Sequence, residues 1–294
     1  MNQAIEAGLL PRLGHRRSIR KFKSNLMVGV TVLATIVALV PLFLVLGYLV
    51  SKGASSVSWN FFTRMPAPVG QPGGGMANAI VGTFELVGIA ILMGVPVGLG
   101  AGIYLAENPV TWLARGVRFA ADSMMGVPSI VIGIFVYAVV VQTVGGFSTL
   151  AGAIALAIIM IPLVTRTTEE MVLLVPAELR EAALALGVAR WRTTLSVVAP
   201  AAASGIATGI ILAIARVAGE TAPLLFTAFG NRFWSTALTQ PIASLTVQVY
   251  TYAISPFADW QRQAWAGALV LTAIVLALEI GVRWITRGSN RVAR

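Results

Sequence analysis

Long uncharged stretches divide this chain of 294 residues into candidate membrane-spanning helices. A helix needs about 20 mainly apolar residues to cross a bilayer, because the hydrocarbon core is about 30 Å thick and a helix rises about 1.5 Å per residue. Stretches of 28 uncharged residues between Lys23 and Lys52, and of 21 between Glu85 and Glu107, are each long enough for one helix. The sequence therefore predicts one span in each stretch.

The uncharged stretch between Asp122 and Arg166 holds 43 residues and is too long for a single span. Its middle, residues 143–149, reads Thr-Val-Gly-Gly-Phe-Ser-Thr, a composition typical of a turn. We therefore expect two helices joined by a tight hairpin. Pro128, near the start of the first of these helices, is expected to kink it.

Two further apolar stretches complete the predicted membrane part. A fifth span follows Arg192 and runs to about Phe229, and a sixth lies at about residues 264–285. The chain is thus predicted to be an all-α integral membrane protein with six transmembrane helices. The expected parts are a basic N-terminal arm at 1–23, a transmembrane domain at 24–286 with a cytoplasmic loop at 167–203, and a C-terminal tail at 287–294.

Composition and charge support this interpretation. Charged residues make up 11% of the chain, against about 25% in an ordinary globular protein. A net charge of +10 in a soluble protein indicates a nucleic-acid partner, but basic loops on the cytoplasmic face of a bilayer account for it here. We expect no nucleic-acid partner.

Several kinds of chemistry are excluded by residues that the chain lacks. It has no cysteine and one histidine, His15, so it can form neither a disulfide framework nor a histidine metal cluster or catalytic triad. None of its lysines follows a glycine, so it has no phosphate-binding loop of the Gly-x-x-x-x-Gly-Lys-Ser/Thr type. We expect no catalytic residue, no metal ion and no cofactor in this chain.

Basic residues also orient the chain, because cytoplasmic loops carry an excess of Lys and Arg. With the N-terminus inside, 16 of the 21 basic residues lie on the cytoplasmic side and four lie outside, while Arg216 falls within a span. Both termini are therefore expected to be cytoplasmic. Residues 52–78 and 230–262 are then outer loops, and the uncharged but polar stretch 233–258 is expected at the outer surface or as a re-entrant segment.

The cytoplasmic loop contains a well-marked short helix. Pro176 suits its first position, Glu178 and Glu181 suit its positive end, and Gly187 suits its left-handed stop. A helix of about 11 residues is predicted here, and a second short helical segment is expected to end at Pro200. Small residues and leucines on both segments allow another protein to approach closely.

Two Arg–Glu pairs lie within or beside the apolar spans. Arg216 costs about 2.5–3.5 kcal/mol to insert at mid-span, and Glu220, one helical turn later, can pair with it. Arg166 and Glu169 repeat the arrangement near the inner end of the fourth span. Arginine offers planar, permanently charged donors to oxyanions, so the pairs can line an anion path. Alternatively, each pair is a buried salt bridge that fixes helix packing without contacting a ligand.

The loop helix has the spacing of a known motif. The motif begins with Glu181-Ala182-Ala183, followed by three residues, Gly187, nine residues, and then an aliphatic residue, any residue, an aliphatic residue and Pro200. This spacing resembles the EAA loop of binding-protein-dependent ABC importer permeases. In that family the loop helix inserts into a groove on a cytoplasmic ATPase. The resemblance thus implies an ATPase-coupling role for Glu181, Ala182, Ala183 and Gly187.

Other strings narrow the resemblance to phosphate importer permeases of the PstA type. They are residues 78–107, 126–133, 166–170 and 216–225. The match covers about residues 24–286 and implies the type I ABC importer permease fold. It also implies that the basic positions Arg216 and Arg166 line the phosphate path, where Glu220 and Glu169 are expected beside them as their paired carboxylates.

The resemblance implies partners as well. These are a second related permease chain, two ATPase subunits that bind ATP and Mg²⁺, and an extracytoplasmic phosphate-binding protein. The chain is then expected in a bacterial cytoplasmic membrane as half of a pore. Two alternatives stay open: a permease for another oxyanion such as molybdate or phosphonate, and an ATP-independent secondary anion carrier, which leaves the EAA spacing unexplained.

Overall fold

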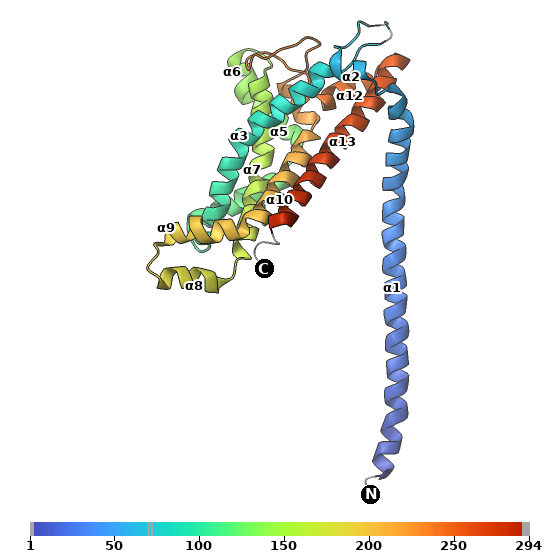
Figure 1. Ribbon diagram of the computed structural model, residues 1–294, viewed down its shortest axis with the longest axis vertical. Helices are drawn as coiled ribbons and strands as arrows, with labels where there is room; N and C mark the ends of the chain where they lie inside the picture. The colour runs from blue at the N-terminus through green and yellow to red at the C-terminus, as the bar shows by residue number, and fades with distance from the viewer. Residues whose placement is uncertain (1–2, 70, 72, 290–294) are drawn as a thin grey trace. The chain divides into compact units, whose positions relative to one another are not determined.

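The computed structural model of the protein describes residues 3–69, 71 and 73–289 and divides the chain into two units (Figure 1). Helix α1 covers Gln3–Gly53. The first unit ends at Ser51 and so contains all of this helix except Lys52 and Gly53, which belong to the second unit. The stretch Arg20–Ser56 is long and apolar enough to cross a membrane, which confirms the first predicted span. Residues 290–294 of the predicted C-terminal tail lie outside the described residues.

The second unit is built of helices joined by loops. Its longer helices are α3 (Ala77–Glu107), α4 (Trp112–Gly126), α7 (Thr149–Leu173), α10 (Ala199–Ala218) and α13 (Ala258–Ser289). Its shorter helices are α2 (Trp59–Thr63), α5 (Ser129–Val136), α6 (Gln142–Val144), α8 (Ala177–Ala185), α9 (Arg190–Thr193), α11 (Ala222–Thr227) and α12 (Leu245–Ala253). A 3-10 turn covers Ala54–Ser56, and π-helical turns cover Tyr137–Val141 and Thr194–Val198.

The described residues contain five helices that are long and apolar enough to cross a membrane, and a sixth candidate that is bent. The bent candidate joins α4 to the α5–α6 segment at an angle of 106°. Val127 and Pro128 are extended there, as expected for proline and the residue before it. The all-α fold is confirmed. The prediction that the third span is a single, kinked helix was too simple, because the chain turns sharply at Pro128.

The hairpin predicted at residues 143–149 is present. Gly145 has a φ of +83°, and Ser148 caps α7 by accepting a hydrogen bond from the backbone N–H of Ala151 at 3.1 Å. Glycine suits position 145 because it adopts left-handed backbone angles without a steric penalty. The turn thus ends α6 and starts α7 within a few residues.

The fifth span differs from the prediction at both ends. It runs from Arg190 to Ala218, so the short segment expected to end at Pro200 is instead continuous with the span. Pro200 lies inside this continuous helix and cannot donate a backbone hydrogen bond, and the π-helical turn just before it, Thr194–Val198, accommodates the proline. At the other end the helix stops at Ala218, before the predicted limit near Phe229.

Close contact between α3 and α7 forms the centre of the core. Three glycines spaced four residues apart, Gly94, Gly98 and Gly102, face α7 on one side of α3. A Cβ added at Gly102 would lie 2.5 Å from the carbonyl oxygen of Thr165. Small residues at this spacing let two membrane helices approach closely and pack.

We predict that Gly102→Ala destabilises the protein, whereas Gly100→Ala does not. The methyl group added at position 102 meets the fixed backbone of α7, and this overpacking lowers the stability by about 1–3 kcal/mol. Gly100 lies on the same helix with open space around its Cβ position, and alanine is the better helix former. Thermal unfolding of the two purified variants in detergent checks this, and equal stabilities would contradict the α3–α7 packing.

Candidate functional site

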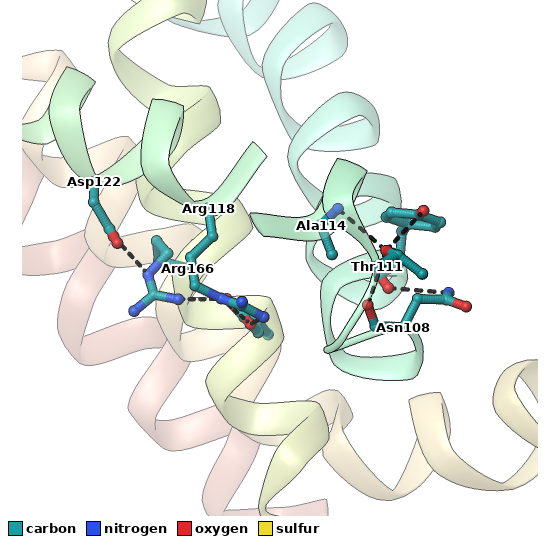
Figure 2. Close-up of polar contacts among 8 residues, drawn as sticks. Asn108, Thr111, Ala114, Arg118, Asp122 and Arg166 are labelled. Carbon is teal, nitrogen blue, oxygen red and sulfur yellow. Dashed lines mark hydrogen bonds and ion pairs between the residues drawn. The ribbon is translucent and has the colours of Figure 1, made fainter. Parts of the chain in front are cut away.

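Four charged side chains join α4 to α7 in one network (Figure 2). Glu169 Oε1 accepts hydrogen bonds from Arg118 Nε at 2.9 Å and Nη2 at 2.5 Å. Its Oε2 accepts from Arg166 Nη1 at 2.5 Å. Arg166 Nε also lies 2.9 Å from Asp122 Oδ1. The pair predicted from sequence, Arg166 with Glu169, is therefore present, together with two partners that were not predicted.

Burial makes Glu169 the centre of this network. Its side chain is 3% exposed, while the two arginines are about a quarter exposed and Asp122 is half exposed. A buried carboxylate is tolerated when both oxygens are paired, and here each oxygen has its own guanidinium. The formal charges sum to zero, which favours the role of a bridge that holds α4 on α7.

We predict that Glu169→Gln lowers stability by about 2–3 kcal/mol, because it leaves two facing guanidiniums without a shared counter-charge. Asp122→Asn is the matched control and is expected to cost less than about 1 kcal/mol, since Asp122 is half exposed. Thermal unfolding in detergent measures both. A Glu169→Gln variant as stable as the control would contradict a structural role for the network.

The start of α4 is fixed by a set of polar contacts that Figure 2 also shows. Thr111 caps the helix, because its Oγ1 accepts a hydrogen bond from the backbone N–H of Ala114 at 3.2 Å. The same hydroxyl donates to the carbonyl oxygen of Asn108 at 3.1 Å, and Asn108 Nδ2 donates to the carbonyl oxygen of Tyr104 at 3.2 Å. These contacts set the direction of α4 and so place Arg118 and Asp122 beside α7.

A signal for Arg118 and Asp122 exists in the sequence. They stand four residues apart, the spacing that puts two side chains on one face of a helix. Asp122 served only as the limit of an apolar stretch, and Arg118 only as one of the 16 basic residues expected on the cytoplasmic side. The same spacing rule that singled out Arg216 and Glu220 would have identified them as facing a common neighbour.

Arg216 lies near the end of α10 and differs from Arg166 in two respects. Its side chain is exposed on this chain, and no ion pair to it occurs among the described residues. The predicted pair with Glu220 is absent because α10 ends at Ala218 and Gly219 follows as its cap. Glu220 is half-buried, and its backbone carbonyl accepts a hydrogen bond from Thr246 Oγ1 at 2.9 Å.

The structure does not bring Arg216 and Arg166 together. Helices α10 and α7 are in contact where Gly209 meets Thr167, since a Cβ at Gly209 would lie 2.6 Å from Thr167 Oγ1. Arg216 is seven residues further along α10, which corresponds to about 10 Å along the helix axis. The two predicted pairs therefore stand at different depths rather than in one cluster.

The predicted loop helix is confirmed as α8, with Pro176 before its first residue and Gly187 at a φ of +79° after its end. The helix has nine residues rather than about 11. Glu181 and Ala182 are exposed, whereas Ala183 is buried. The exposed surface of α8 and its flanks combines the carboxylates Glu178 and Glu181 with large apolar side chains, namely Leu174, Leu179, Leu184, Leu186 and Trp191.

One arginine anchors α8 to the two packed helices of the core. Arg180 forms an ion pair with Glu107 at the end of α3, and its Nη2 donates to the carbonyl oxygen of Val172 in α7 at 3.0 Å. Both contacts were missing from the sequence-based prediction. Through them, a displacement of α8 acts directly on the ends of α3 and α7.

Comparison with known proteins places this arrangement among transporters. The family model described as "Binding-protein-dependent transport system inner membrane component" matches residues 98–291. The "Phosphate transport system permease protein PstA" of Yersinia pestis is 47% identical over 281 residues, which cover 95% of both chains. The "Probable phosphate transport system permease protein PstA" of Methanocaldococcus jannaschii is 36% identical over 91% of this chain and 95% of its own.

A solved structure supports the same fold. The permease-like chain in the structure titled "Inward facing conformations of the MetNI methionine ABC transporter" matches with a TM-score of 0.60 and 18% identity. The match covers 72% of this chain and 96% of that one. At this identity the likeness concerns the fold, and it agrees with the predicted importer fold.

Proposed function

Because the chain belongs to the family of binding-protein-dependent transport system inner membrane components, we propose that it is the permease subunit of an ATP-driven phosphate importer. The chain forms half of the translocation pore and carries no catalytic residue. ATP and Mg²⁺ bind to separate ATPase subunits. Phosphate passes through without any covalent step on this chain.

The observation that carries the proposal is Arg216, which is exposed within an apolar span and has no ion pair among the described residues. An arginine facing lipid inside a span is unfavourable, by about 2.5–3.5 kcal/mol at the centre and less towards the ends, so such residues face a partner helix or a water-filled path. A second, related permease chain that covers this side of α10 places Arg216 at the pore. There its planar guanidinium can donate two parallel hydrogen bonds to phosphate oxygens.

Glu220 lies just beyond the end of α10 and contributes a nearby carboxylate. A negative charge close to the arginine weakens the hold on the anion, and conduction requires binding that is weak enough for release. Arg166 and Glu169 lie deeper along the same proposed path. Their ion pairs favour a positioning role, in which they keep α4 against α7 while the pore moves.

Helix α8 is the proposed contact with the ATPase. Glu181, Ala182, Ala183 and Gly187 carry the EAA spacing on a helix whose outward surface includes large apolar side chains, as a groove-binding helix requires. Closure of the ATPases on ATP shifts α8, and the Arg180 contacts transmit the shift to α3 and α7. ATP binding thereby opens the pore outward, and hydrolysis resets it inward.

The proposed location is a bacterial cytoplasmic membrane, with both termini in the cytoplasm. The excess of basic residues on one side supports this orientation. Helices α8 and α9 then lie on the cytoplasmic side, and α2 and α6 lie at the opposite end of the second unit (Figure 1). An extracytoplasmic phosphate-binding protein delivers the anion to that outer end.

Purification of the tagged chain from membranes in a mild detergent tests the assembly. We expect two ATPase subunits and a second permease chain to copurify. A chain that purifies alone and takes up anion on an ion gradient would instead be a secondary carrier. Competition with labelled phosphate separates the substrates: excess molybdate or phosphonate should leave uptake unchanged, and strong inhibition by either would indicate a permease for that anion.

A further inference from the structure

A polar cavity of about 240 Å³ lies between α2 and the beginning of α13. In Figure 1 these elements are at the end of the second unit away from α8, which is the outer end in the proposed orientation. Hydrogen-bonding side chains from both segments line it. The polar residues used in the argument are Ser56, Ser58, Asn60, Arg64, Arg262 and Gln263.

The charge of this cavity is positive. Arg64 is exposed and has no ion pair among the described residues, while Arg262 forms an ion pair with Asp259. Two guanidiniums and one carboxylate leave a formal charge of +1. Serine hydroxyls and the Asn60 amide add neutral donors nearby. This combination suits an oxyanion better than a cation or an apolar ligand.

Gln263 joins the two sides of the cavity. Its residue is 8% exposed, its Nε2 donates to the carbonyl oxygen of Gly73 at 2.5 Å, and its Oε1 has no hydrogen-bond partner among the described residues. The Gly73 contact fixes the amide orientation, because a carbonyl can only accept. Oε1 itself is buried from solvent and is not a contact for a ligand in the cavity; the hydrogen bond from Nε2 ties the start of α13 to the loop that follows α2.

The wall of the cavity is preformed by backbone contacts. The loop after Gly74 packs against the end of α2. The backbone N–H of Met76 donates to the carbonyl oxygen of Phe61 at 2.9 Å, and the backbone N–H of Ala77 donates to the carbonyl oxygen of Arg64 at 3.2 Å. A Cβ at Gly75 would lie 2.4 Å from the carbonyl oxygen of Asn60. This packing fixes the backbone at the end of α2, which carries Arg64, without help from a ligand.

We propose that this cavity is an outer reception site for inorganic phosphate, separate from Arg216. Arg64 and Arg262 bind the charged oxygens, and the serine hydroxyls and the Asn60 amide donate further hydrogen bonds to the anion. The proposal rests on the proposed function for its substrate and for the outer placement of the cavity.

The absence of cysteine from the chain allows a direct test. Ser58 lines the cavity and makes no capping hydrogen bond, so Ser58→Cys places a single thiol there without removing a contact. The full chain, in its assembled transporter in right-side-out membrane vesicles, is treated with a cationic, membrane-impermeant methanethiosulfonate. Phosphate at about ten times its dissociation constant is expected to slow the modification about tenfold, because only the empty site reacts.

Two controls separate the site from other effects. Ser58→Cys combined with Arg64→Gln and Arg262→Gln should react at the same rate with and without phosphate, and chloride at the same ionic strength should not protect the single Ser58→Cys variant. Protection that survives loss of both arginines, equal protection by chloride, or no protection overturns the proposal. A thiol that reacts only after permeabilisation overturns the outer placement.

Uptake by the same vesicles distinguishes this site from the proposed function. Uptake of phosphate without protection of Ser58→Cys rejects the reception site and leaves the importer intact. Protection without ATP-dependent uptake rejects the importer and leaves an anion site. Phosphate uptake together with protection that depends on both arginines supports both the reception site and the importer function.

Discussion

An Arg216→Gln variant is expected to assemble with its partners and to lose about 10- to 100-fold of its phosphate uptake, since a hydrogen bond to a charged group contributes about 1.5–3 kcal/mol. The substitution removes the charge that the described residues leave unpaired. It breaks no ion pair within the described part of the chain, so the fold should be unaffected. Initial rates of labelled phosphate uptake, normalised to the amount of assembled transporter, measure the effect.

Arg216→Lys is the companion variant. It keeps the positive charge but loses the planar pair of donors, so it should also lose uptake while the complex still assembles. Uptake near the wild-type level in Arg216→Gln would remove Arg216 from the path. Loss of assembly in both variants would indicate that Arg216 holds the two permease chains together instead.

The second large effect is expected from Glu181→Lys. Glu181 is exposed on α8, so the change should leave membrane insertion and stability intact. Reversal of its charge at the proposed ATPase groove is expected to reduce uptake at least about tenfold, because a like charge placed across an interface costs several kcal/mol. ATPase copurification and ATP hydrolysis are measured alongside uptake, and uncoupled hydrolysis or a lost ATPase is the expected result.

Glu178→Lys is the control for this variant. It makes the same charge change one turn earlier on α8, where the side chain is also exposed, and it lies outside the Glu-Ala-Ala string. Its effect on uptake should be clearly smaller. Equal uptake by Glu181→Lys and the wild type would contradict the coupling role of α8.

Local signals predicted the parts of the fold that depend on local chemistry. The limits of α8 follow from Pro176 and Gly187, and the hairpin before α7 follows from its turn residues. Both require only that a residue type suits a backbone conformation. For the same reason, uncharged length alone located most of the spans.

The errors arose where tertiary structure decides. A proline signals an interruption but not its size, and the 106° turn at Pro128 depends on how α4 packs against α7. Pro200 interrupts nothing, because the π-helical turn before it supplies the adjustment. Arg216 and Glu220 stand at a helical spacing in sequence, yet the helix ends between them.

The sequence predicted the contacts of the candidate site that lie within one helix, but not those between helices. Spacing within one helix identified Arg166 and Glu169 as partners, and they are. Contacts between helices distant in sequence, such as Arg118 with Glu169 or Arg180 with Glu107, need the fold before they can be seen. The cavity beside Gln263 likewise joins two segments about 200 residues apart in the chain.

The central claim is that this chain carries phosphate inward at the expense of ATP hydrolysed by other subunits. Its most direct test is uptake of labelled phosphate into proteoliposomes that contain the purified complex, with the binding protein outside and ATP and Mg²⁺ inside. The account predicts uptake that needs both the binding protein and ATP and that stops when Arg216→Gln replaces the wild-type chain. Uptake that proceeds without ATP on an ion gradient alone would contradict it.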